Sequence, residues 1–319
     1  MADAPGAVAK RTRQGLKLQG APVSERFGSS CPICWEPWDV NEGGRVWTCC
    51  FRKVCNTCTT KTQDSPCSFC RAAPPILSEA LAQIRRHAEN GVPEAITDLA
   101  GAYRYGDYGL VKDMKMAVKL YKRAATLGDA DAMVCLGHRY EHGDGVRQSL
   151  KKAQELYRTA ASRGHYLAQN NLGSCLRQVG KLEEAFAMTM RAAEQGYAGA
   201  ECIIGCHYRR GVGVEASEAS ARLWYARSAA KGDLMAQHNL GLMYAFGDGG
   251  AVDLGEAKRL FARAAAQGDK AANGPNSRRA VEGAKLALAE VERLIRAAGG
   301  DADAASKAGE RRVRAARRR

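Results

Sequence analysis

Apolar and small residues recur at helical spacing along most of the chain after residue 78, and the pattern itself repeats. Each unit ends with a glycine that follows a stretch of small and charged residues, as in AATLG and AAEQG. These glycines are Gly91, Gly128, Gly164, Gly196, Gly232 and Gly268, with spacings of 37, 36, 32, 36 and 36 residues. Internal periods of about 20–50 residues indicate a solenoid of stacked units. The sequence therefore predicts an all-helical solenoid.

Each unit contains two predicted helices. The first begins near an alanine four residues after the glycine, passes an aliphatic–small pair such as Leu136-Gly137, and ends near a tyrosine column. That column is Tyr103, Tyr140, Tyr208 and Tyr244, with Leu176 in the third unit. The small residue after each leucine predicts a close approach of two helices. The second helix ends at the next glycine, which acts as a C-cap. The third unit is short because it lacks the glycine loop between its helices.

These motifs resemble Sel1-like repeats, relatives of the tetratricopeptide repeat, over residues 79–269. The resemblance implies about five repeats, preceded by a partial one at 78–91, and a concave face that binds a protein client. Stacked repeats need caps, and residues 277–297 form an amphipathic pattern suited to that role. We therefore expect a capping helix within 270–298 and a basic, disordered tail over 299–319.

A second pattern precedes the repeats. Eight of the twelve cysteines lie between residues 31 and 70, spaced C-x2-C, x14, C-C, x4, C-x2-C, x8, C-x2-C. Four thiolates bind one tetrahedral zinc ion, so eight are enough for two. The alternative is a set of disulfides, which an oxidising compartment would favour. Regular C-x2-C spacing and the lack of a secretory signal favour zinc.

The cysteine segment resembles a RING finger in which every zinc ligand is cysteine. The resemblance implies a small two-zinc α+β module over 31–71, joined to the solenoid by a linker at 72–78. It implies one zinc ion on Cys31, Cys34, Cys55 and Cys58, and a second zinc ion on Cys49, Cys50, Cys67 and Cys70. It also implies a ubiquitin ligase, in which Ile33 and Arg71 contact a ubiquitin-charged conjugating enzyme.

The cysteine segment departs from the RING pattern in three ways. Cys49 and Cys50 are adjacent, the usual proline after Cys67 is replaced by Ser68, and the stretch TTKTQD is polar. These departures keep a second interpretation open, a non-catalytic interaction scaffold with a structural zinc finger. Trp35 and Trp38 add apolar surface for a partner or pack around the zinc ions.

The formal net charge is +14, and six arginines lie in the last nine residues. Basic runs of this kind bind nucleic acid or act as a nuclear address; the plainer interpretation is a solvated tail. Residues 1–30 are expected to be disordered, since they lack apolar periodicity. No apolar run approaches the ~20 residues of a membrane span. We therefore expect no membrane partner and a cytoplasmic protein, with the nucleus as the alternative compartment.

Few other residues offer chemistry. Cys135, Cys175, Cys202 and Cys206 fall in first helices and are interpreted as core thiols. Cys202, Cys206 and His207 form an alternative metal cluster, and His138 and His142 share a helix face without a third ligand. No nucleophile constellation or phosphate-binding glycine loop is present, so the chain offers no catalytic residue of its own.

Overall fold

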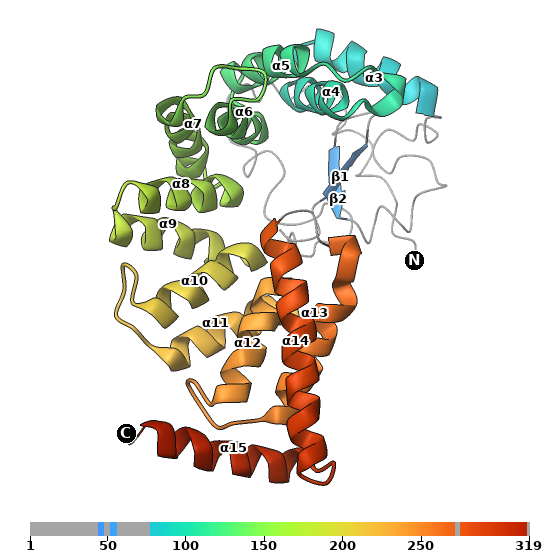
Figure 1. Cartoon of the computed structure of the whole chain (residues 1–319). Coiled ribbons are helices and arrows are strands. Elements are labelled where there is room, and N and C mark those ends of the chain that lie inside the picture. Colours follow the sequence, from blue (N-terminus) through green and yellow to red (C-terminus); the bar gives the residue numbers. More distant parts are fainter. Residues whose placement is uncertain (1–43, 48–51, 56–76, 272–274, 318–319) are drawn as a thin grey trace, which may run out of the picture.

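The computed structural model describes residues 44–47, 52–55, 77–271 and 275–317. Its main body is an arc of helices, seen in Figure 1. The helices from α4 to α13 occur as five pairs, each pair forming one repeat, and all have 13 residues except the longer α13. The repeat helices and the helix before them are α3 Leu77–Glu89, α4 Pro93–Tyr105, α5 Met114–Thr126, α6 Ala130–His142, α7 Leu150–Ser162, α8 Tyr166–Gln178, α9 Leu182–Glu194, α10 Ala198–Arg210, α11 Glu218–Ala230, α12 Leu234–Phe246 and α13 Leu254–Ala271.

The two helices of each repeat form two layers. In Figure 1, α4 and α6 lie on the hollow side of the arc, while α5 and α7 lie on its outer side. The even-numbered first helices therefore form the inner layer, whose hollow-side surface we call the inner face. At the position of the predicted partial unit, α3 packs against α4 as an outer helix does.

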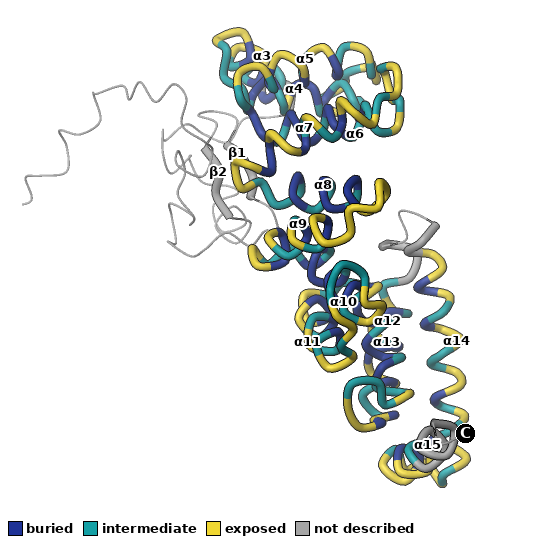
Figure 2. The backbone as a smooth tube through the Cα atoms, turned by 90° about the vertical axis from the view of Figure 1, so that its left-hand side faces the viewer, coloured by how far each residue is buried: buried dark blue, intermediate teal, exposed yellow. Residues whose placement is uncertain are grey.

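The core lies between the layers. The alanine column Ala95, Ala132, Ala168, Ala200 and Ala236 is fully buried. Large rings from the outer helices pack against the small residues of the inner helices, as Tyr157 does against Gly137. A Cβ atom on Gly137 would lie 2.6 Å from Cε1 of Tyr157. The predicted close approach of helices at the small residue is confirmed. Figure 2 shows buried and exposed positions alternating along the helices.

Glycine loops lock each repeat to the one before it. Gly145, Gly213 and Gly249 have positive φ and lie against the first turn of α5, α9 and α11, respectively. A Cβ atom at these positions would collide with backbone or buried side chains, so only glycine fits. The third repeat has only Val179, Gly180 and Lys181 between its helices. The first turn of α7 therefore has no such loop over it, and Leu150 stays 53% exposed.

The C-terminal end is capped by two helices. Where a capping helix was predicted, α14 Pro275–Ala297 packs on α12 and α13. The predicted disordered tail is wrong for most of its length, because residues 302–317 form α15 Ala302–Arg317. Ser306 Oγ accepts from the backbone N–H of Leu254 at 2.9 Å, and Ala305 is buried. Thus α15 covers the first turn of α13, as the next repeat's loop would.

A two-stranded antiparallel sheet lies in the cysteine-rich region. It consists of β1 Gly44–Trp47 and β2 Arg52–Cys55, with Gly44 opposite Cys55 and Trp47 opposite Arg52. The predicted disordered segment at 1–30, the linker and most of the predicted zinc module lie outside the described residues. In the part of the chain that is described, no helix has the length and apolar character to cross a membrane.

Candidate protein-interaction surface

Hydrogen bonds between successive outer helices hold the repeats in register. In four of the five repeats, a side chain near the C-terminal end of the outer helix donates to a backbone carbonyl 35 residues earlier. Lys231 Nζ donates to Gly196 O at 2.6 Å, and Gln267 Nε2 donates to Gly232 O at 2.8 Å. Arg123 and Arg163 donate to the carbonyls of Ala88 and Gly128 in the same way. These bonds fix the spacing of the inner helices and hence the shape of the inner face.

Repeats three, four and five also contain a polar pair between their inner and outer helices, in which the inner-helix partner is buried. Gln195 Nε2 donates to Gln169 Oε1 at 2.7 Å, and Gln267 Nε2 donates to Gln237 Oε1 at 2.9 Å. In the fourth repeat, a carboxylate and a cation replace the amides. Glu201 is fully buried, and its oxygens lie 3.1 Å from Arg227 Nη2 and 3.0 Å from Lys231 Nζ. A buried carboxylate is tolerated only when it is paired in this way.

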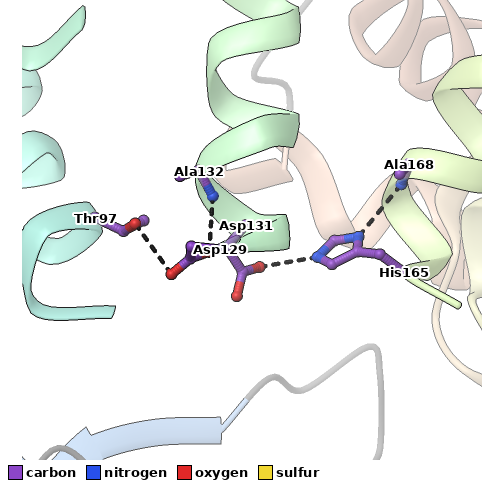
Figure 3. A network of polar contacts seen from close by, with 6 residues as sticks. All are labelled: Thr97, Asp129, Asp131, Ala132, His165 and Ala168. Carbon is purple, nitrogen blue, oxygen red and sulfur yellow. Dashed lines mark hydrogen bonds and ion pairs between the residues drawn. The ribbon is translucent and has the colours of Figure 1, made fainter. Parts of the chain in front are cut away.

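A second polar network joins the first turns of successive inner helices, as Figure 3 shows. Asp129 caps α6, accepting from Ala132 N at 2.9 Å, and accepts from Thr97 Oγ1 at 3.2 Å. His165 caps α8 by accepting from the Ala168 N–H through Nδ1, so its Nε2–H donates to Asp131 Oδ1 at 3.0 Å. The caps of adjacent repeats are thus connected. Burial raises the pKa of Asp129 to about 6, and the nearby Asp131 contributes in the same direction.

Asp129→Asn is expected to remove a destabilisation of the folded state that grows as the pH rises. A folded-state pKa of about 6, above the unfolded value of about 4, means that the folded chain holds the proton more tightly. This contribution to stability is present at low pH and is lost as pH rises through 6. When the pH is raised from 5 to 8, the unfolding free energy of the variant should increase by about 1 kcal/mol relative to that of the wild type. Urea unfolding at both pH values measures this.

The matched control is Asp113→Asn. Asp113 caps α5 through the same bond to a backbone N–H, from Met116 at 2.9 Å, but its side chain is exposed. Asparagine caps helices as well as aspartate does, so this variant should show no comparable pH-dependent gain. An equal gain in both variants would contradict the role of burial at Asp129.

The inner layer contains a cavity of about 440 Å³ between α8 and α10. Gly173, Thr189, Ile203 and other apolar surfaces form its walls, and the exposed Arg177 and Arg210 lie at its rim. Asn170 Oδ1 is buried in the wall, and no described group donates a hydrogen bond to it. Pockets that bind small molecules or side chains measure about 300–1,000 Å³. This cavity is therefore large enough to hold part of a partner.

The sequence did not predict this cavity, although it singled out two of its lining residues, Cys206 and His207, as candidate metal ligands. A signal was present, however, because Thr189 occupies the position that holds an aromatic ring in the other outer helices of the repeats. Aligning the second helices would have shown Tyr121, Tyr157, Thr189, Tyr225 and Phe261 in one column. Only the structure shows that the missing ring leaves a space next to two arginines.

The cysteines of the repeats act mainly as core residues, as expected. Cys175 and Cys202 are buried. Cys206 lines the cavity, and its sulfur accepts from the Tyr225 hydroxyl at 3.1 Å. A hydrogen bond from Cys202 lowers the pKa of Cys206, with a smaller contribution from Tyr225.

The alternative metal sites do not form within the described residues, where no group of three or more metal-ligating side chains occurs. His207 Nδ1 is bonded to the Val212 carbonyl at 2.5 Å, which ties its ring to its own loop. His138 and His142 stack at 4.1 Å between ring centroids. His142 Nδ1 is bonded to the His138 carbonyl at 3.0 Å.

The predicted zinc ligands fall mostly outside the described residues, as do Ile33 and Arg71. Cys55 is the exception, being the last residue of β2. In sequence, Cys49 and Cys50 lie between the two strands. The two zinc ions and the contact with a conjugating enzyme therefore stay predictions.

Comparison with known proteins identifies the repeats. The Sel1 repeat model matches residues 93–129, 130–165, 198–233 and 234–269. The chain is 32% identical over 166 residues to the chitin synthase regulator SKT5 of Malassezia restricta, covering 49% of this chain and 12% of that protein. It is 32% identical over 162 residues to chitin synthase regulatory factor 3 of Schizosaccharomyces pombe, covering 47% and 17%. The chain thus spans less than a fifth of either relative.

A solved structure supports the same conclusion. The Sel1 repeat protein from Oxalobacter formigenes superposes with a TM-score of 0.57 at 29% identity, covering 65% of this chain and 91% of that one. Its alignment extends over more residues than the four matched repeats alone. Residues 93–165 and 198–269 therefore match the Sel1 repeat, and they form part of an all-helical, Sel1-like solenoid.

Proposed function

We propose that the protein is an interaction adaptor whose solenoid binds a client protein on its inner face. The observation that carries this proposal is the cavity between α8 and α10, open at a rim of two exposed arginines. Among the described residues, no carboxylate lies within ion-pair distance of either guanidinium. The rim is therefore free to pair with acidic groups of a client. Two relatives of the repeats carry names of enzyme regulators, which fits a protein that acts by binding.

Reversing charge on the two faces tests this proposal. A variant with Arg177→Glu and Arg210→Glu on the inner layer is compared with one carrying Arg158→Glu and Arg191→Glu on α7 and α9. All four arginines are exposed, so both variants should fold. Proteins retained by the immobilised wild type should be lost from the inner variant and kept by the outer variant, as measured by quantitative mass spectrometry. Equal retention by both variants would refute an inner-face client site.

A second and more specific candidate function is that of a ubiquitin-ligase adaptor, in which the cysteine segment recruits a conjugating enzyme. The pattern of eight cysteines favours it, and the β1–β2 hairpin is compatible with a small cysteine-rich fold. In a ligase of this type, two zinc ions shape the finger. Ile33 and Arg71 would contact the charged enzyme and hold its thioester in a reactive geometry. Without this activity, the same finger would be a second binding module.

Elemental analysis and a ubiquitination assay separate these possibilities. We expect two zinc ions per chain, and one ion would mean that the Cys49–Cys50 site is incomplete. Mixed with activating enzyme, ubiquitin and a panel of conjugating enzymes, the protein should form ubiquitin chains, and Arg71→Ala should form fewer. Two bound zinc ions without chains on any conjugating enzyme would leave the adaptor proposal standing and reject the ligase.

A further inference from the structure

The cavity between α8 and α10 has a specific origin in the repeat pattern. In the other four repeats, the eighth residue of the outer helix is an aromatic ring that fills the space between two inner helices. These rings are Tyr121, Tyr157, Tyr225 and Phe261, all buried. In the third repeat the residue is Thr189, which is 2% exposed and donates to the Ala185 carbonyl at 2.9 Å. The cavity therefore lies where this repeat lacks its ring.

Two polar residues of the cavity, one a donor and one able to accept, occupy the positions whose side chains receive tyrosine hydroxyls in other repeats. The Tyr157 hydroxyl donates to Glu141 at 2.9 Å, and the Tyr225 hydroxyl donates to Cys206 at 3.1 Å. In α8 the corresponding positions are Arg177 and Ser174, both of which line the cavity. Asn170 Oδ1 is a further buried acceptor there, with no donor among the described residues. A phenol that entered the cavity would find hydrogen-bonding partners.

The charge at the rim narrows the choice of ligand. Arg177 and Arg210 bring two positive charges, and Cys206 is the acidic group among the lining residues. Even with the Cys206 thiolate ionised, the lining residues have a net charge of about +1 from these groups. Guanidinium groups pair well with carboxylates. The surroundings thus favour a ring that is flanked by acidic residues.

We propose that this cavity binds a tyrosine side chain from an acidic segment of a partner protein, with the partner's ring filling the space of the missing one. The proposal rests on the adaptor function, and it names the chemistry of the client. The ring would pack between Gly173 and Ile203, while flanking carboxylates would pair with the two rim arginines. A client segment would thereby complete the third repeat in trans.

Fluorescence polarisation with the full chain tests the proposal. The probe is a fluorescein-labelled peptide of sequence GDEYEDG, compared with versions that carry phenylalanine or alanine in place of tyrosine. We expect the tyrosine peptide to bind at least tenfold more tightly than the alanine peptide, with the phenylalanine peptide between them. Equal affinity for the tyrosine and alanine peptides, or no binding of any peptide at 1 mM, would overturn the proposal.

Filling the cavity from within provides the matched variants. Thr189→Tyr installs the ring of the other repeats and should lower affinity for the tyrosine peptide at least tenfold. Thr189→Val, which replaces the hydroxyl with a methyl group of similar size, should leave binding within about twofold. Ser174→Leu is a second way to fill the cavity, because Leu242 holds the same position in α12. Thermal melts check that each variant folds, and full affinity in both filled variants would overturn the proposal.

Two further results would assign the cavity to a different occupant or to none. Tighter peptide binding after Trp35→Ala and Trp38→Ala would assign it to the chain's own WEPWD segment, and it would overturn a partner site. No preference for tyrosine in the peptide assay, together with loss of clients from the inner-face charge variant, would reject the tyrosine pocket alone. If neither the cavity variants nor the charge variant alters binding, the adaptor function fails as well.

Discussion

Lys231→Gln is expected to destabilise the solenoid by about 2–3 kcal/mol, a large effect for a residue that is one-third exposed. Its partner Glu201 has no exposed surface, and Lys231 Nζ lies 3.0 Å from the Glu201 carboxylate. Truncating the cation leaves a buried negative charge with one remaining cation, Arg227, at 3.1 Å. The loss should therefore exceed that of an ordinary surface ion pair, which is usually worth less than about 1 kcal/mol.

The neighbouring junctions show how to rescue this variant. Repeats three and five use Gln195 with Gln169 and Gln267 with Gln237 at the positions of Lys231 and Glu201. The double variant Glu201→Gln, Lys231→Gln copies that amide pair and removes the buried charge. We expect its stability to return to within about 1 kcal/mol of the wild type. Two residues in direct contact are expected to show coupling of this size.

Urea unfolding, together with hydrogen exchange at α10 and α11, measures the effect globally and locally. The control is Lys258→Gln, whose ion pair with Glu292 spans 3.3 Å with both side chains substantially exposed. That variant should lose less than about 0.5 kcal/mol. If Lys231→Gln is no more destabilising than Lys258→Gln, or if the double variant is no more stable than the single one, the buried pair does not hold this junction.

The sequence predicted the repeats well, because the features that define them are local. An alanine column, a leucine followed by a small residue and a terminal glycine each report on one helix or one turn. The helix pairs of the solenoid were confirmed, and α14 lies where a capping helix was predicted. These patterns could not show which polar residues meet between helices, since Glu201 and Lys231 are 30 positions apart and meet only when α10 and α11 pack together.

The sequence-based prediction was wrong for the C-terminal segment and missed the cavity, and the two errors have different physical causes. The C-terminal segment was expected to be disordered because its arginines dominate the composition. However, Ala305 and Ser306 turn one face of α15 toward α13, and Gly309 allows close contact with Val252. The cavity was missed because it arises from an absence, one ring in a column of five, rather than from a motif. The sequence-based prediction of nucleic-acid binding by the basic end of the chain is neither supported nor contradicted by α15.

Gly137→Ala is expected to destabilise the protein by about 1–3 kcal/mol, although alanine favours a helix over glycine by about 1 kcal/mol. Gly137 lies in α6, where a Cβ atom would be 2.6 Å from Cε1 and 3.0 Å from Cδ1 of Tyr157. The Tyr157 ring is fully buried, and its hydroxyl is bonded to Glu141 at 2.9 Å. The ring therefore cannot move aside without losing both packing and a hydrogen bond.

Gly101→Ala is the matched control, since Gly101 is also inside an inner helix but has room for a Cβ atom. The nearest atom to that Cβ would be the Tyr121 hydroxyl oxygen at 4.0 Å. This variant should gain up to about 1 kcal/mol from helix propensity alone. Thermal and urea unfolding of the two variants should thus shift in opposite directions. A shift of both toward greater stability would mean that the inner and outer helices can separate at Gly137, and that their close approach is not what sets the geometry of the repeat.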